Sequence, residues 1–266
     1  MQLYAPTAWI NYLTRRRMSQ HPVQEAVNMF WELRSRAASR QAAGGKADTG
    51  QRRAVTAGQH MQELEEVVIQ EFVNAGIPRE CIRRKSGVEL PGYYRPAKKW
   101  DVVVVYRSAL VAAIEFKSQV GPSFGNNINN RTEEAIGSAS DVWRAYEEGT
   151  FGAVRPWLGY FFVLEAAPKS SPVALPSTVS PVEEIFKNTS YLDRYRILCQ
   201  RLVRERLYDV ACFITTAPGS SDATAVLNEP ELELSFANFA AAIAGRVVYM
   251  RGLLDNEPDH GRAALP

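Results

Sequence analysis

The hydrophobic positions of this chain follow two periods, and their order predicts an α/β fold. Apolar residues spaced three or four apart predict helices, and short apolar runs predict strands. The predicted helices cover residues 61–75, 130–149, a segment starting at 180, 191–207 and 236–253. The predicted strands cover residues 88–90, 100–106, 110–118, 157–165 and 209–216. This order indicates an α/β sandwich around a mixed β-sheet flanked by helices.

Residues typical of helix ends fix three of these boundaries. Gly76 stands where the first predicted helix needs a C-terminal cap. Asn130 and Glu133 have the spacing of a capping box, and Ser180 followed by Pro181 gives an N-cap and a first-turn proline. The segment before Asn130 is therefore interpreted as a loop.

The stretch between residues 37 and 59 is rich in Gly and Ala and has no hydrophobic period. Such composition is typical of a mobile connector. We therefore expect an N-terminal helical arm with its connector over residues 1–57 and one catalytic domain over residues 58–266.

Composition indicates a soluble protein, with 46% hydrophobic and 23% charged residues. No apolar stretch reaches the roughly 18 to 20 residues that span a bilayer. The basic residues Arg15–Arg17 follow the first apolar residues instead of preceding them, which is the wrong order for a signal peptide. These features predict a cytoplasmic location and no membrane partner.

The cysteines and histidines exclude several chemistries. The three cysteines Cys81, Cys199 and Cys212 are widely spaced, which favours neither disulfides nor a zinc cluster. The three histidines show no HExxH pair and no triad setting. Catalysis would therefore use carboxylates and lysine, with or without a hard metal ion.

The net charge is only +2, but the basic residues are grouped. A single basic run is usually a solvated face. Several runs together are more consistent with a surface for phosphate groups. The clusters are 15–17, 52–53, 83–85, 95 with 98–99, and 194–206.

Three ionisable residues interrupt the most apolar part of the chain, WDVVVVYRSALVAAIEFKSQ. In a strand, Glu115 and Lys117 project from one face about 7 Å apart. Asp101 lies opposite Glu115 if the two strands form a hairpin with a three-residue loop over 107–109. A five-residue loop would also keep the carboxylates on one face, whereas a two-residue loop would put them on opposite faces unless a bulge restores the register.

Two neighbouring carboxylates repel each other and need a cation between them. Lys117 alone could supply it, as a structural ion pair on a half-exposed strand. Alternatively, two carboxylates with room for water suit Mg²⁺, which activates phosphodiesters.

The spacing Asp101, thirteen residues, Glu115-Phe116-Lys117 resembles the PD-(D/E)xK nuclease motif, with Trp100 in place of the proline. A wider resemblance, from about Gly58 to Thr216, is to the XhoI family of type II restriction endonucleases. The segments that carry it are LPGYYRPAKKWD, AAIEFKSQVGPSFGNNINNRTEEAIGSASD, PWLGYFFVLE and RLVRERLYDVA.

The resemblance implies a restriction-endonuclease-like core and a homodimer that hydrolyses both strands of CTCGAG with Mg²⁺, leaving 5′-phosphates, without an organic cofactor. Asp101, Glu115 and the Phe116 carbonyl would be metal ligands, and Lys117 would position the attacking water. A glutamate on the preceding helix often joins such sites. Glu66 and Glu65 are the candidates, although either could equally be a solvated helix residue.

The segment GPSFGNNINNR is the best candidate for DNA contacts, because Asn and Arg pair with base edges. The candidates there are Asn126, Asn127, Asn129, Asn130 and Arg131. Lys98 and Lys99 precede Asp101 and are expected to contact the DNA backbone. Turn formation, helix capping and a solvated strand entry are the competing interpretations.

Two other functions fit the same residues. One is a repair or recombination nuclease that uses the triad on structured DNA. The other is a non-catalytic DNA-binding protein in which Glu115 and Lys117 form a structural ion pair.

Overall fold

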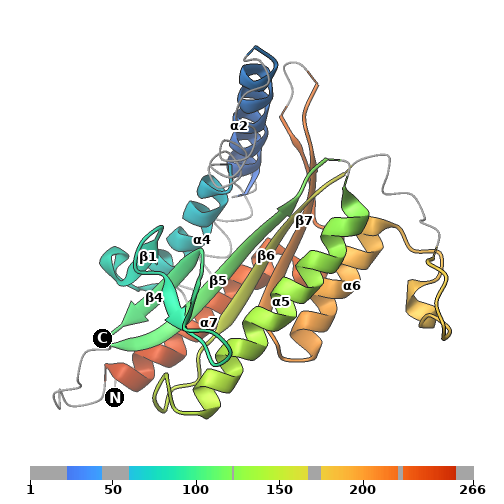
Figure 1. Ribbon diagram of the computed structural model, residues 1–266. Coiled ribbons are helices and arrows are strands. Elements are labelled where there is room, and N and C mark those ends of the chain that lie inside the picture. The colour runs from blue at the N-terminus through green and yellow to red at the C-terminus, as the bar shows by residue number, and fades with distance from the viewer. Residues whose placement is uncertain (1–22, 44–59, 122, 167–174, 221–223, 256–266) are drawn as a thin grey trace. The chain divides into compact units, whose positions relative to one another are not determined.

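The computed structural model describes residues 23–43, 60–121, 123–166, 175–220 and 224–255 (Figure 1). The chain divides into two compact units, residues 1–67 and 68–266. The predicted arm and connector, residues 1–57, fall largely outside the described residues. The domain boundary at residue 57 therefore stays a prediction.

The described part of the first unit is helical. Helix α2 spans Gln24–Ala43 and buries Ala26, Val27 and Phe30 along one side. Helix α4, Gln62–Ala75, matches the predicted helix and crosses the boundary between the units. Gly76 follows it with a φ of +108°, the left-handed backbone expected of a C-terminal cap.

The second unit is built on a six-stranded mixed sheet in the order β1-β4-β5-β6-β7-β8. Strand β5 pairs antiparallel with β4 and parallel with β6, and β7 continues the parallel part. The strands are β1 (Ile82–Arg84), β4 (Val102–Tyr106), β5 (Ala109–Gln119), β6 (Leu158–Glu165), β7 (Val210–Ala217) and β8 (Val226–Asn228). The predicted mixed sheet flanked by helices is confirmed.

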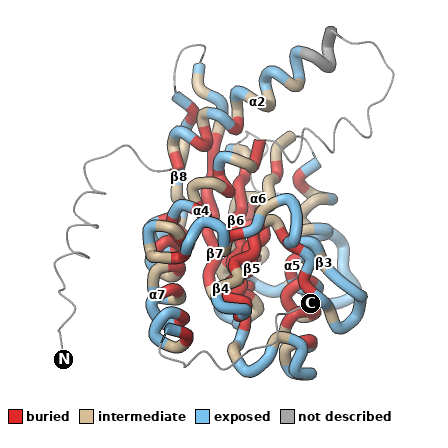
Figure 2. Tube along the Cα trace, turned by 90° about the vertical axis from the view of Figure 1, so that its left-hand side faces the viewer, coloured by how far each residue is buried: buried red, intermediate tan, exposed pale blue. Residues whose placement is uncertain are grey.

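Helices cover both faces of this sheet (Figure 1). Helices α5 (Phe124–Glu147) and α6 (Tyr191–Arg204) lie over one face, and α7 (Phe236–Leu254) lies over the other. Alternation along β6 explains the two layers, since Phe161 contacts the rings of α7 while Phe162 stacks on Tyr195 of α6. The central strands are the most buried part of the fold (Figure 2).

The strand predicted at residues 88–90 does not belong to this sheet. Strands β2 (Glu89–Pro91) and β3 (Ala97–Lys99) form a separate two-stranded hairpin, and β1 is the outer strand instead. The sequence prediction missed β1, because a three-residue strand carrying two arginines has no apolar run.

Two predicted helix starts are wrong. Helix α5 begins at Phe124 and not at Asn130, because Phe124 is buried and Ile128, one turn later, packs on the same core. The expected helix at Ser180 is only a short 3₁₀ turn, Glu184–Phe186. Its segment buries too few apolar side chains to stabilise a helix.

The next helix, α6, has a capping box of its own. The Ser190 side chain accepts a hydrogen bond from the Asp193 backbone N–H, and the Asp193 carboxylate accepts one from the Ser190 N–H. The remaining described elements are short 3₁₀ turns at Arg79–Cys81 and Leu232–Leu234. Among the helices that the structure describes, none is long and apolar enough to span a bilayer.

Candidate active site

The hairpin of β4 and β5 brings Asp101 beside Glu115, by a different turn from the predicted one. Tyr106 pairs with Ala109, so the loop has two residues, both with positive φ (47° and 60°). The three-residue loop is therefore wrong. A bulge on β5 compensates, because Val104 pairs with Ala112 and Val105 with Leu110, which leaves Val111 unpaired.

The bulge restores the register needed for a shared site. Val102 pairs with Ile114, and the Asp101 N–H lies 3.3 Å from the Ile114 carbonyl oxygen. A two-residue turn in which both residues have positive φ matches the twist of a hairpin. The extra residue of the bulge then returns the two carboxylates to the same face of the sheet. The expectation that a bulge can rescue the geometry is thus met.

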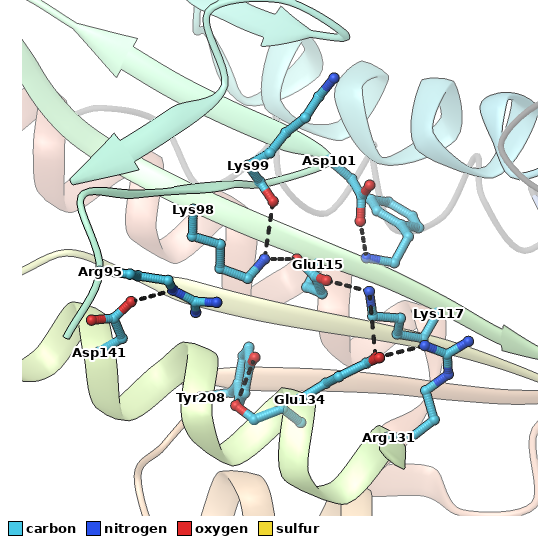
Figure 3. Close-up of polar contacts among 12 residues, drawn as sticks. Arg95, Lys98, Lys99, Asp101, Glu115, Lys117, Arg131, Glu134, Asp141 and Tyr208 are labelled. Carbon is cyan, nitrogen blue, oxygen red and sulfur yellow. Dashed lines mark hydrogen bonds and ion pairs between the residues drawn. The ribbon is translucent and has the colours of Figure 1, made fainter. Parts of the chain in front are cut away.

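Glu115 is buried, and each of its carboxylate oxygens contacts an ammonium group (Figure 3). The Nζ of Lys117 lies 2.5 Å from Oε1, and the Nζ of Lys98 lies 2.5 Å from Oε2. Glu115 is thus paired with two cations at once.

Asp101 reaches the same strand through the backbone. Its Oδ2 accepts a hydrogen bond of 2.7 Å from the Phe116 N–H. Burial, and next the nearby charge of Glu115, raise the pKa of Asp101 to about 6, although the Phe116 N–H and both lysines oppose the rise. Burial therefore disfavours the charged form of Asp101 more than its hydrogen bond and the two lysines favour it.

These groups offer only oxygen donors to a metal ion. The N–H and C=O of one strand residue point to the same side, so the Phe116 carbonyl is directed toward the side on which Asp101 lies. Two carboxylates and a carbonyl suit Mg²⁺, which binds one or two carboxylates and keeps several waters. Among the described residues, no three Asp, Glu, His or Cys side chains are placed so that they could hold one metal ion, so protein carboxylates would fill only part of the shell.

Helix α5 closes the other side of the cluster. Glu134 lies 3.9 Å from the Lys117 ammonium and pairs with Arg131 at 2.6 Å. Between α5 and the β2–β3 hairpin lies an open cleft of about 500 Å³. Its lining includes Tyr94, Lys98, Lys99, Glu115, Lys117 and Glu134.

The residues around this cluster fall within a stretch that matches a known family. The family model described as restriction endonuclease XhoI matches residues 40–226, well over half of the chain. The chain belongs to the XhoI restriction endonuclease family. It is therefore a site-specific deoxyribonuclease that acts on double-stranded DNA.

Curated relatives of this family agree with the assignment. The type II restriction enzyme BstVI of Geobacillus stearothermophilus is 44% identical over 179 residues, covering 65% of this chain and 80% of that enzyme. AbrI of Azospirillum brasilense is 47% identical over 154 residues (57% and 69%), and XhoI of Xanthomonas vasicola is 41% identical over 181 residues (66% and 72%). No solved structure matches the chain.

The asparagines predicted to contact DNA lie on the first two turns of α5 and not in a loop. Asn126, Asn129 and Asn130 are exposed. Asn127 is held in place, since its Nδ2 donates a 2.6 Å hydrogen bond to Gln119. Three of the four side chains are thus available to a ligand of this endonuclease.

The predicted basic contacts differ from one another. Lys99 is exposed, whereas Arg131 is engaged by Glu134 and Lys98 by Glu115. The roles of these residues toward DNA stay predictions.

Glu65 and Glu66 belong to the first unit, because they precede residue 68. Glu65 is buried and Glu66 is half-buried. Asp101, Glu115 and Lys117 belong to the second unit, so the participation of a helix glutamate stays a prediction.

Sequence reasoning missed Asp141 and Glu134 as neighbours of the site, and it gave Arg95 only as part of a basic cluster. Asp141 accepts hydrogen bonds from residues more than 40 positions earlier. Glu134 carried a usable signal, because it lies in AAIEFKSQVGPSFGNNINNRTEEAIGSASD, one of the segments that carry the resemblance to the family.

Proposed function

We propose that this endonuclease hydrolyses both strands of the palindrome CTCGAG in a Mg²⁺-dependent reaction that leaves 5′-phosphates. The observation that carries the proposal is the gathering of Asp101, Glu115 and Lys117 around the Phe116 backbone. Their order and spacing are those of the PD-(D/E)xK motif, and we assign the core to that nuclease class. Membership of the XhoI family supports the sequence CTCGAG.

The oxygen donors of Asp101, Glu115 and the Phe116 carbonyl would hold the Mg²⁺. When bound, the ion supplies Lewis acidity at the scissile phosphate. Its binding is consistent with the raised pKa of Asp101, whose cause is burial and then the charge of Glu115. A cation between the two carboxylates relieves this repulsion. We also propose Glu66, or Glu65, as an additional carboxylate.

The surroundings of Lys117 support a role in orienting the attacking water. Its ammonium is held by Glu115 Oε1, yet 23% of the side chain is exposed to the cleft. An ammonium carries three donors, so one bond to Glu115 leaves others for a water or a phosphate oxygen. We assign to Lys117 the positioning of the nucleophile.

We further propose that Lys99, Asn126, Asn129, Asn130 and Arg131 contact DNA on the rim of this cleft. Asparagine amides and guanidinium groups can read base edges, whereas lysine binds phosphates. A palindrome is matched by a two-fold symmetric protein, so we propose a homodimer that places one cleft on each strand. Residues 58–266 would form its nuclease domain and residues 1–57 an accessory arm.

Digestion of a fully sequenced plasmid, with Mg²⁺ or with EDTA, tests this proposal. We expect cutting only with Mg²⁺, at CTCGAG, with ligatable 5′-phosphate ends identified by end sequencing. Cutting at another fixed sequence would refute the specificity and leave the centre standing. Cutting in EDTA, or only at junctions and flaps, would overturn the assignment.

A further inference from the structure

The Lys98 side chain is held in place by three neighbouring groups in the candidate active site. Its ammonium contacts Glu115 Oε2 at 2.5 Å, the Lys99 carbonyl oxygen at 3.1 Å and the face of the Trp100 ring at 4.2 Å from the centroid. Only 11% of the side chain is exposed. A lysine that simply awaits a DNA phosphate would extend into solvent, whereas the ammonium of Lys98 points toward Glu115 and the Lys99 carbonyl oxygen (Figure 3).

The β2–β3 hairpin fixes the position of Lys98 beside Glu115. The buried Asp141 of α5 accepts hydrogen bonds from the Tyr93 N–H at 2.7 Å, the Tyr94 N–H at 2.8 Å and the Arg95 Nε at 2.6 Å. At Gly92, an added Cβ would lie 2.5 Å from the Asp141 carboxylate, so the hairpin approaches α5 as closely as only glycine allows.

Occupation of both Glu115 oxygens has a consequence for metal binding. A divalent ion that uses Glu115 must share or replace one of the two ammonium groups. Lys117 bridges toward α5 and has a role in the reaction. Lys98 has no assigned part in the chemistry. Its positive charge is therefore the one that opposes binding of the ion to Glu115 without serving the reaction.

We propose that Lys98 is the counterion of Glu115 in the metal-free enzyme and competes with the metal ion for Oε2. Lys98 neutralises the carboxylate pair before the ion arrives, and it thereby weakens metal binding when DNA is absent. Once displaced, its ammonium lies at the cleft and can bind a DNA phosphate. This inference rests on the proposed metal site.

The test compares Lys98→Met with Lys99→Met, which removes a neighbouring charge that does not contact Glu115. Calorimetry measures the Kd for Ca²⁺ without DNA, and thermal unfolding in EDTA measures Tm. For Lys98→Met we expect a Tm lower by several degrees and a Kd for Ca²⁺ tighter by about tenfold, which corresponds to about 1.4 kcal/mol. For Lys99→Met we expect both values to stay near those of the wild type.

Opposite shifts of stability and metal affinity distinguish this role from a purely structural one, which would lower both. Lys98→Arg should restore the Tm and the weaker Ca²⁺ binding. If Lys98→Met does not fold, Lys98→Gln keeps a donor near Glu115 without the charge and should still tighten Ca²⁺ binding. Unchanged or weaker Ca²⁺ binding in a folded Lys98 variant overturns the proposal.

Asp101→Asn separates this proposal from the metal site on which it depends. This variant should lose Ca²⁺ binding. If it binds Ca²⁺ as the wild type does, the assigned metal site is wrong and the role of Lys98 fails with it. Loss of binding in Asp101→Asn together with an unchanged Kd in Lys98→Met refutes the role of Lys98 alone.

Discussion

At the scale of one residue, Asp101 shows how burial in the site disfavours a charged carboxylate. Its pKa is raised from 3.8 to about 6 by burial and then by Glu115. The folded chain therefore holds a proton in this range that the unfolded chain has already released. The contribution of Asp101 to the free energy of unfolding consequently falls as the pH rises through this window.

Replacement of Asp101 by Asn should remove this pH-dependent penalty. In EDTA, we expect Asp101→Asn to gain stability relative to the wild type as the pH rises from 4 to 7.5, by on the order of 2 kcal/mol. Denaturant unfolding at a series of pH values measures the difference. A stability difference between the two proteins that does not change with pH would contradict the raised pKa.

The same residues show which part of the site the sequence could predict. Asp101, Glu115 and Lys117 are found from strand alternation, since residues two apart share a face. The contact of Lys98 with Glu115 could not be found in that way. This contact depends on a hairpin that is anchored by Asp141, 43 positions from Lys98 in the sequence. A local pattern carries no information about such a contact.

The helices and strands also divide into those that local sequence patterns predict and those that depend on distant contacts. The strands β4 to β7 and the helices α4 and α7 follow apolar runs that the sequence displays. The bulge at Val111 is invisible in that pattern, because Leu110, Val111 and Ala112 are all apolar. The start of α5 was missed because the asparagines around Phe124 and Ile128 have weak helix propensity. Burial of Phe124 and Ile128 against the core outweighs the weak propensity of these asparagines.

The β2–β3 hairpin should lose its anchor when Asp141 is changed to Asn. Burial alone would raise the pKa of Asp141, but its donors Tyr94, Arg95 and Tyr93 hold that pKa below its usual value. We expect a loss of about 2 kcal/mol of stability. Amide exchange at Tyr93 and Tyr94 should become faster than in the wild type.

A matched control for that prediction is Glu184→Gln, which breaks the exposed Lys187–Glu184 pair. An exposed ion pair contributes about 0–1 kcal/mol, so little change is expected. Metal binding gives a further readout, because a loosened hairpin should release Lys98 from Glu115 and tighten Ca²⁺ binding. Unaltered exchange at Tyr93 and Tyr94 would show that Asp141 does not position the hairpin.

At the scale of the whole molecule, the match to the XhoI family and the site coincide. The matched residues 40–226 contain β1 to β7 and the helices α4, α5 and α6, whereas α7 lies beyond them. The family assignment therefore rests on the sheet, on the cleft and on the helix layer that faces it. The net charge of +2 says little about DNA binding, whereas the lysines and the arginine grouped at the cleft are suited to phosphate groups.

We propose that Lys117 belongs to a centre that cuts DNA, and not to a structural ion pair. The most direct measurement is cleavage and binding of one CTCGAG duplex by Lys117→Met, with Lys187→Met as the control outside the cleft. We predict that Lys117→Met folds, binds the duplex in Ca²⁺ nearly as the wild type does, and cuts it in Mg²⁺ at least about a hundredfold more slowly. Wild-type cutting by Lys117→Met would contradict a catalytic role of Lys117.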